Sequence, residues 1–250
     1  MTDWIVITAP GSDIGQVLTE HLLEQGYGII GMGRANSMQY LASLEYERLY
    51  RIECDYTDEE SMEHAFTVAR EQVKQIAGLI HLVGGSLVST PLEALDLNTF
   101  HEVMAVNTYS AFLAGREAVR WMKEGGGGNI IFFGSTTGIE PIAGKLAYGA
   151  AKAAVHNLTL SFALEGSAYE IITNTIAPAY VMTKRHQQEI KKKAERSTIS
   201  EEEIMKELRQ KNPLHRVLQT TELIPSVELL LQTTVIQGQI LQVDLGQIRI

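Results

Sequence analysis

Residues 4–24 read WIVITAPGSDIGQVLTEHLLE, in which a short apolar run, a glycine-containing turn and an amphipathic segment follow one another. The apolar run predicts a strand over residues 5–8, and the amphipathic segment predicts a helix over residues 16–24. A glycine-containing turn at this place lets backbone amides approach a phosphate, and the helix N-terminus adds positive potential. Because a plain strand–turn–helix unit has the same pattern, the turn by itself leaves a phosphate site and a structural connection both open.

The same alternation of short apolar runs and longer amphipathic segments continues along the chain. Further strands are expected at residues 28–32, 49–53, 79–83, 129–133, 171–176 and 240–243, and further helices at residues 59–75, 98–123, 147–167 and 221–232. Continuous aliphatic runs are typical of strands that are buried on both faces of a sheet. Strand–helix alternation of this kind predicts right-handed crossovers and a doubly wound parallel α/β sheet with helices on both faces.

The composition narrows the class of protein. The chain has 250 residues, of which 45% are hydrophobic and 20% charged, and no Pro- or Ser-rich linker divides it, so we expect a single domain over residues 1–250. The net charge of −9 argues against a nucleic-acid surface. One cysteine and seven scattered histidines argue against a disulfide framework and a metal site. No apolar stretch reaches the roughly 20 residues of a membrane span, so we expect a cytoplasmic protein without a membrane partner.

Residues 183–215 break the alternation, because this segment is polar, long and helical in pattern and follows the carboxyl end of an expected strand. Ligands of open α/β sheets bind at the carboxyl ends of the strands. The segment is therefore placed to act as a lid over a ligand site. A helical excursion on the surface without such a role is the alternative.

Two charged residues follow expected strands near the phosphate turn. Arg34 comes after the strand that ends at residue 32, where a carboxylate would hold the ribose hydroxyls of NAD; a guanidinium suits a 2′-phosphate instead, which favours NADP. An ordinary surface arginine is the alternative. Asp55 follows the third strand and can accept a hydrogen bond from an adenine amino group. Alternatively, Asp55 or Thr57 caps the helix that begins near residue 59.

The strongest chemical pattern is Tyr148-Gly149-Ala150-Ala151-Lys152, with Ser135 upstream at a strand end. Residues four apart on a helix share a face, with Cβ atoms about 5–6 Å apart. An ammonium at Lys152 is then expected to lower the pKa of the Tyr148 phenol, which is roughly 10 when unperturbed. Such a tyrosine can exchange a proton with a carbonyl or hydroxyl oxygen, and the Ser135 hydroxyl can hydrogen-bond the same oxygen.

These patterns occur together in one family, and the chain resembles the short-chain dehydrogenase/reductases from end to end. The stretches that carry the resemblance, besides the Tyr148–Lys152 pair, are Gly134-Ser135-Thr136-Thr137-Gly138, Val106-Asn107, Asn174-Thr175-Ile176-Ala177-Pro178-Ala179 and the final strand from Gly238 to Gly246. The resemblance implies a single Rossmann-type domain and an NAD(P)-dependent oxidoreductase, a ketoreductase that transfers hydride between nicotinamide and a carbonyl or secondary alcohol. It also implies a homotetramer or homodimer packed through the helices that bear Asn107 and Tyr148.

The resemblance further assigns roles to single residues. Tyr148 is implied to be the general acid/base, Lys152 to bind the nicotinamide ribose, Ser135 to orient the substrate oxygen, and Asn107 to hold a proton relay. The residues implied to bind the cofactor are Thr8, Ser12, Asp13, Ile14, Gly15, Arg34, Asp55, Tyr56, Val83, Gly84, Tyr148, Lys152, Pro178, Val181 and Thr183.

Two segments depart from the family pattern. The family has three glycines in its cofactor loop, at the positions of Ala9, Asp13 and Gly15, of which only Gly15 is a glycine here. Asp13 brings a carboxylate toward the pyrophosphate unless it turns away or caps the following helix, and its position favours capping. The family's Asn-Asn-Ala-Gly segment reads His81-Leu82-Val83-Gly84, and His81 is expected to be a structural side chain rather than a catalyst.

These departures leave two other classes of function open. A relative that uses serine and tyrosine without a nucleotide would be a cofactor-free lyase, and a relative without catalysis would be a regulatory or binding module. The complete set of Asn107, Ser135, Tyr148 and Lys152 favours the oxidoreductase. The expected substrate pocket is bordered by the lid and by small or apolar residues: Gly85 to Val88, Thr137, Ile139, Pro141, Ile142 and Tyr180. Arg185, His186 and Arg216 could bind a carboxylate there, but their positions do not follow from the sequence.

Overall fold

A computed structural model describes residues 3–248, and the described residues form a seven-stranded parallel sheet in the order β3-β2-β1-β4-β5-β6-β9. The strands are β1 (Trp4–Thr8), β2 (Gly28–Gly33), β3 (Leu49–Glu53), β4 (Gly78–His81), β5 (Gly128–Phe133), β6 (Ile171–Pro178) and β9 (Ile240–Val243). The strand order reverses between β1 and β4, and ligands of such sheets bind at this switch point. The predicted doubly wound α/β fold is confirmed; residues 1–2 and 249–250 of the expected domain lie outside the described residues.

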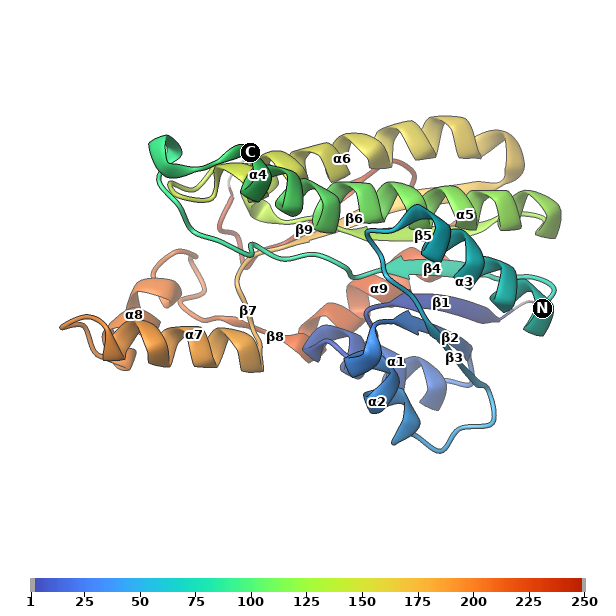
Figure 1. Cartoon of the computed structure of the whole chain (residues 1–250), viewed down its shortest axis with the longest axis horizontal. Coiled ribbons are helices and arrows are strands. Elements are labelled where there is room, and N and C mark those ends of the chain that lie inside the picture. The colour runs from blue at the N-terminus through green and yellow to red at the C-terminus, as the bar shows by residue number, and fades with distance from the viewer. Residues whose placement is uncertain (1–2, 249–250) are drawn as a thin grey trace.

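Helices cover both faces of the sheet (Figure 1). One face carries α1 (Asp13–Glu24), α2 (Ala35–Ala42) and α9 (Ile224–Gln232), and the other carries α3 (Glu59–Gln72), α5 (Ser110–Gly125) and α6 (Leu146–Gly166). Successive side chains of one strand enter opposite layers: Ile5 and Ile7 pack toward the first set of helices, whereas Val6 packs toward the second. The continuous apolar strands of the sequence therefore serve two cores.

Helix α4 (Leu97–Met104) and α5 are joined by a π-helical segment, Ala105–Tyr109, where the sequence predicts one uninterrupted helix. A π-helical turn inserts an extra residue into the helix and is common at functional sites. Asn107 lies in this segment. Hydrophobic periodicity over residues 98–123 does not reveal such a local widening, since the pattern of apolar residues on either side is still helical.

The structure also contains a helix that was not predicted and a strand that is shorter than predicted. Helix α2 was not predicted, because eight residues of mixed polarity give a weak periodic signal. Strand β4 ends at His81 instead of residue 83, because the Leu82 backbone N–H donates to the Thr8 hydroxyl (3.1 Å) and not to a neighbouring strand. The chain after His81 is thereby free to form a loop at the carboxyl end of the sheet.

The segment expected as a lid forms two helices, α7 (Lys184–Glu195) and α8 (Glu201–Arg209), which project from the body of the domain (Figure 1). A small parallel pair of strands, β7 (Val181–Met182) and β8 (Leu218–Gln219), lies at its base. Helix α8 begins with a reciprocal capping box between Ser200 and Glu203. Among the described residues, no helix is long and apolar enough to cross a membrane.

The glycine-containing turn holds a non-glycine residue in the left-handed region, since Ala9 has a φ of 51°. This conformation costs an L-residue about 1–2 kcal/mol. We therefore predict that Ala9→Gly raises the free energy of unfolding by about 1 kcal/mol, as measured by denaturant titration. Gly26→Ala is the matched control of opposite sign, because Gly26 has a φ of 85° and no atom lies within 4 Å of an added Cβ. An unchanged or lower stability of Ala9→Gly would contradict the strain argument.

Candidate active site

A buried imidazole links the first strand to the helix layer above the sheet. The Thr8 hydroxyl accepts from Leu82 N–H and lies 3.1 Å from His81 Nδ1, while His81 Nε2 lies 3.2 Å from Ser110 Oγ. Ser110 Oγ donates its proton to the Val106 carbonyl (2.6 Å), so it can only accept a hydrogen bond from His81 Nε2–H. The other ring nitrogen, Nδ1, is then unprotonated and accepts a hydrogen bond from the Thr8 hydroxyl. Burial lowers the pKa of His81 to about 3, helped by the charge of Lys152. His81 is the structural side chain that the sequence predicted.

Asn107 binds the backbone of the loop that follows β4. Its amide accepts from Gly85 N–H (2.9 Å) and donates to the Gly85 carbonyl (3.0 Å) and to the Val103 carbonyl (2.9 Å). A Cβ on the preceding Gly84 would lie 2.7 Å from both Asn107 Oδ1 and Lys152 Nζ. The loop therefore passes directly over these two side chains, and only glycine fits at residue 84.

Lys152 is buried below this loop, with 3% of its surface exposed. Its ammonium donates to the Phe133 carbonyl (2.7 Å) at the end of β5 and lies 5.9 Å from the centre of the Tyr148 ring. Burial lowers the pKa of Lys152 to about 8.

The expectation that Lys152 lowers the pKa of Tyr148 is wrong. Burial raises the pKa of the Tyr148 phenol above its ordinary value, and the opposing effects come from the Ser135 hydroxyl and from Arg185. The reason is that the Lys152 ammonium is directed to the Phe133 carbonyl. Helical spacing placed the two residues together but did not fix the direction of the lysine side chain.

Ser135 follows β5 and is held by a histidine that the sequence argument missed. The Ser135 backbone N–H donates to His156 Nε2 (3.4 Å), and its hydroxyl accepts from Thr137 N–H (3.1 Å). A Cβ on Gly134 would overlap the His156 ring, so this turn needs a glycine. His156 lies one helical turn after Lys152 on α6, a spacing that could have indicated it.

The glycine-containing turn forms the N-terminus of α1 differently from the prediction. Ser12 is the capping residue, and its hydroxyl accepts from Gly15 N–H (3.1 Å). The expectation that Asp13 caps α1 is wrong, since the Asp13 carboxylate accepts from the backbone N–H of Lys184 (2.5 Å) in the first turn of α7. Gly15 packs on the turn itself, because an added Cβ would overlap the Ala9 carbonyl oxygen.

Arg34 and Asp55 meet at the outer end of this region. Arg34 Nη2 lies 2.8 Å from Asp55 Oδ1, and both side chains are about half exposed. The hydrogen bond from Arg34, followed by that from Thr57 N–H, lowers the pKa of Asp55 to about 2. Asp58, and neither Asp55 nor Thr57, caps α3 by accepting from Ser61 N–H (2.7 Å), so that alternative for Asp55 is wrong.

The remaining candidates for cofactor binding divide by exposure. The side chains of Thr8, Tyr56 and Val83 are buried, and Ile14 packs against the apolar core, so a ligand would meet mainly their backbone. Arg34 lies over the Tyr56 ring, 5.6 Å from its centre. Pro178 ends β6, Val181 begins β7, and the Thr183 hydroxyl caps α7 by accepting from His186 N–H (3.2 Å).

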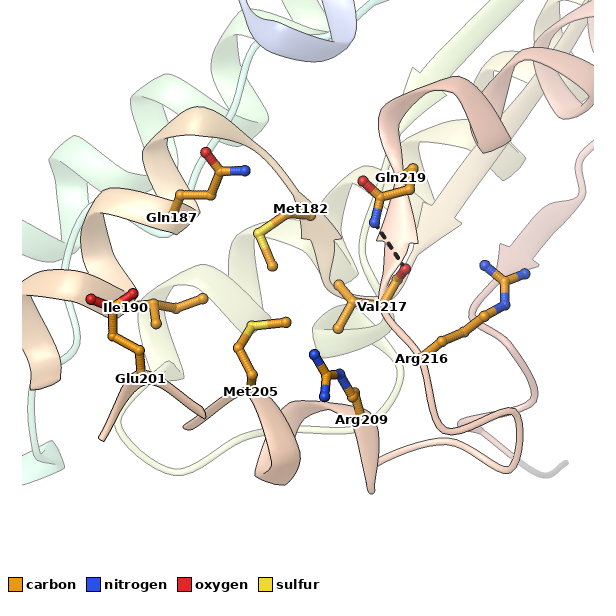
Figure 2. Close-up of a pocket in the computed structure, with 9 residues that line it drawn as sticks. All are labelled: Met182, Gln187, Ile190, Glu201, Met205, Arg209, Arg216, Val217 and Gln219. Atoms are coloured by element: carbon orange, nitrogen blue, oxygen red, sulfur yellow. Dashed lines mark hydrogen bonds between the residues drawn. The ribbon is translucent and has the colours of Figure 1, made fainter. Parts of the chain in front are cut away.

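One cavity lies beside the site, and another lies within the projecting helical segment. The first, of about 850 Å³, is lined by Thr137, Pro141 and Ile142, which were expected at the substrate pocket, together with residues 89–92 and the start of α6. The other, of about 560 Å³, lies between β7, β8 and the two lid helices (Figure 2). In Figure 2 the thioethers of Met182 and Met205 point toward one another across this cavity. The second cavity was not predicted, because it depends on how β7, α7, α8 and β8 pack against one another, and this packing does not follow from the sequence pattern.

Comparisons with known proteins identify the family of this chain. Residues 3–194 match the short chain dehydrogenase family. The 3-oxoacyl-[acyl-carrier-protein] reductase MabA of Mycobacterium tuberculosis is 27% identical over 179 residues, which cover 72% of this chain and 69% of the relative. D-beta-hydroxybutyrate dehydrogenase of Rhizobium meliloti is 27% identical over 237 residues, 92% of each protein. Sorbitol-6-phosphate 2-dehydrogenase SrlD of Erwinia amylovora superposes with a TM-score of 0.92 at 25% identity, covering 98% and 100% of the two chains.

The chain therefore belongs to the short-chain dehydrogenase family. Its activity class is that of an oxidoreductase.

The buried histidines predict a pH-dependent stability. Because the pKa of folded His81 is about 3 and that of His156 about 4, against about 6.5 unfolded, the unfolded chain binds more protons between these values. Stability is then present above pH 6.5 and lost as the pH falls. We predict a loss of about 1 kcal/mol per imidazole between pH 7 and 5.5, measured by denaturant unfolding. His81→Gln removes its share of this slope, with exposed His64→Gln as control; equal slopes in wild type and His81→Gln would refute the argument.

Proposed function

We propose that this protein is an NADP-preferring ketoreductase that interconverts a carbonyl compound and a secondary alcohol, with Tyr148 as the group that exchanges the proton. The observation that carries the proposal is the convergence of Asn107, Ser135, Tyr148 and Lys152 around the ends of β4 and β5. These residues come from a π-helical segment, a strand end and α6, so their meeting is not a by-product of sequence proximity.

The geometry of the chain fits a nicotinamide dinucleotide. Gly15 lets the turn pack closely at the N-terminus of α1, where backbone amides attract phosphate. Asp13, the residue most at odds with a pyrophosphate, has its carboxylate on the Lys184 N–H of the lid, and this hydrogen bond offsets part of its charge. At the other end, the Gly84 backbone packs directly on the Lys152 ammonium. We assign this ammonium to the nicotinamide ribose hydroxyls.

The residues divide the chemistry as follows. A bound nicotinamide would supply or accept the hydride. Tyr148 gives its phenolic proton to the carbonyl oxygen in reduction and takes it back in oxidation. Ser135 stands beside the phenol and donates a hydrogen bond to the same oxygen. Asn107 fixes the Gly84–Gly85 backbone above Lys152, which is the part of its proposed relay role that its hydrogen bonds support.

The lid and the cofactor preference belong to the same proposal. We assign residues 183–215 to a lid over substrate and cofactor, because Lys184 contacts the glycine-containing turn while Arg185 reaches Gly85. We assign Arg34 to the 2′-phosphate of NADP, since its half-exposed guanidinium is held at the end of β2 by Asp55. The assignment of Asp55 to the adenine amino group is retained, because its carboxylate is half exposed beside the same arginine.

Assembly and location extend the proposal. We propose a homodimer or homotetramer formed through the α4–α5 and α6 surfaces, where Tyr109, Phe112, Leu160 and Leu164 are exposed. We also propose a cytoplasmic enzyme, for which the single buried, unpaired Cys54 suits a reducing compartment. A regulatory module or a cofactor-free lyase has no specific observation in its favour, because neither needs a buried Lys152 beside Tyr148.

Titration with NADPH and NADH tests the redox proposal directly. We expect both nucleotides to change the intrinsic fluorescence or the nucleotide emission, with the tighter binding for NADPH. The absence of binding by either nucleotide would overturn the proposed function.

Replacement of Tyr148 by Phe tests the proton-transfer role. We expect Tyr148→Phe to lower kcat by at least 100-fold, because the proton donor is lost, while the Kd for NADPH changes by less than a few-fold. The exposed Tyr169→Phe is the matched control and keeps wild-type kcat. Turnover by Tyr148→Phe at the wild-type rate would show that another group transfers the proton.

Replacement of Arg34 tests the cofactor preference. We expect Arg34→Ala to weaken NADPH binding by about 10- to 100-fold through loss of a charge-assisted hydrogen bond, and NADH binding by only a few-fold. The ratio of the two Kd values is the measurement. An unchanged ratio would remove Arg34 from the 2′-phosphate site.

A further inference from the structure

A lid arginine reaches the catalytic end of the cleft. A Cβ on Gly85 would lie 3.0 Å from Arg185 Nη1, so the guanidinium lies over this glycine. Gly85 is the residue that Asn107 holds by two hydrogen bonds. Arg185 is also close enough to Tyr148 to oppose the rise in its pKa. The guanidinium is thus beside the catalytic group, although its residue belongs to α7.

The first turn of α7 fixes the direction of this arginine. His186 Nδ1 donates to the Val181 carbonyl (2.7 Å), which leaves Nε2 as an acceptor for Arg185 Nη2 (3.4 Å). The His186 ring lies against the Tyr180 ring, with 4.4 Å between their centres. These contacts hold the guanidinium in place, while about half of the Arg185 side chain remains exposed.

A second cation borders the same space from the catalytic side. Lys145 immediately precedes α6 and donates to Ser86 Oγ (2.7 Å) and to the Val88 carbonyl (3.4 Å), in the loop that follows Gly85. Burial lowers the pKa of Lys145, while the nearby Glu189 carboxylate opposes this shift and the charge of Arg185 adds to it. The loop after β4 is therefore bordered by Arg185 on one side and by Lys145 on the other.

The positive charge at this place is only partly balanced. Within residues 3–248, Arg185 has one ion pair, with Glu189 at 3.4 Å, and the Glu189 side chain is 57% exposed. Neither Lys145 nor buried Lys152 has an ion pair in the described part of the chain. Arg185 and Lys145 thus share a single nearby carboxylate, that of exposed Glu189, in a protein whose net charge is −9. Such a local excess attracts an anion and raises its concentration at the cleft.

We propose that Arg185 and Lys145 bind a carboxylate carried by the substrate, so that this enzyme acts on oxo acids and the corresponding hydroxy acids. The inference rests on the proposed function and names its substrate class. Arg185 presents a planar donor pair suited to a carboxylate, and Lys145 adds a point charge close to the carbonyl that Tyr148 protonates.

The position of Arg185 favours a substrate carboxylate over a phosphate of the dinucleotide. The phosphate-binding turn contacts the lid one residue earlier, through the hydrogen bond of Lys184 N–H to Asp13. The Arg185 side chain instead reaches the Gly85 end of the cleft, which lies over Asn107 and next to Tyr148. Lys184 therefore contacts the glycine-containing turn, whereas its neighbour Arg185 contacts the loop at Gly85.

Matched pairs of acids and esters test the substrate class. We expect the enzyme with NADPH to reduce at least one of pyruvate, acetoacetate and levulinate with a kcat/KM at least tenfold higher than that of its methyl ester, which differs by the charge. Equal or faster reduction of the esters, or no reduction of any of the three acids, would overturn the carboxylate proposal. NADPH binding with turnover of neutral ketones would then leave the proposed function standing, whereas failure to bind either nucleotide would defeat both.

Variants separate the carboxylate site from a general role of the lid. Arg185→Gln is expected to lower kcat/KM for the preferred acid by 10- to 100-fold and for its ester by less than threefold, with an unchanged Kd for NADPH. Arg185→Lys should recover part of the loss, and Lys145→Gln should repeat the acid-specific loss. Lys191→Gln removes the same charge from an exposed site on α7, and it should leave kcat/KM unchanged for both the acid and the ester. A parallel loss for acid and ester, or a weakened NADPH affinity, would assign Arg185 to lid closure or to the cofactor instead.

Discussion

The buried, neutral imidazole of His81 connects the central strands β1 and β4 with helix α5. One His81 nitrogen accepts a hydrogen bond from the Thr8 hydroxyl, and the other donates a hydrogen bond to Ser110. The Ser110 hydroxyl in turn donates to the backbone carbonyl of Val106, next to Asn107. The positions of Asn107 and of the Gly84–Gly85 loop thus depend on an uncharged ring between β1 and α5. Burial keeps this ring neutral, and a charged imidazole could not accept from Thr8. The family's asparagine at this place is replaced by a residue with a defined structural task.

In the glycine-containing turn, too, a residue that departs from the family pattern has a structural contact. Asp13 stands where a family glycine is expected, yet its carboxylate binds the first backbone N–H of α7, and an anion at a helix N-terminus is favourable. Ala9 keeps the left-handed conformation that glycine would adopt without strain. The turn thus combines a left-handed residue at Ala9 with a direct contact to α7 through Asp13. The Asp13 side chain therefore connects the glycine-containing turn with the first turn of α7.

The sequence predicted most of the fold because the strands bury both faces and the helices have one apolar side, and both patterns are local. It failed where a local pattern has no distinct signature. The π-helical segment around Asn107 looks like ordinary helix, α2 is too short to show a period, and β4 loses two residues to a hydrogen bond with Thr8. Spacing also put Lys152 beside Tyr148 correctly but gave the wrong pKa effect, since the ammonium is directed to Phe133 and burial raises the phenol pKa.

The sequence by itself determined the class of the protein and the residues with chemical capacity, because residue types at fixed spacing on one helix or one strand end are set by backbone geometry. Only the tertiary structure decided where the charged groups of Arg185 and Lys145 lie. Arg185 approaches the Gly85 loop because of how α7 packs, and Lys145 approaches it from the loop before α6. Side-chain direction and burial are products of packing between distant segments, and no spacing along the chain encodes them.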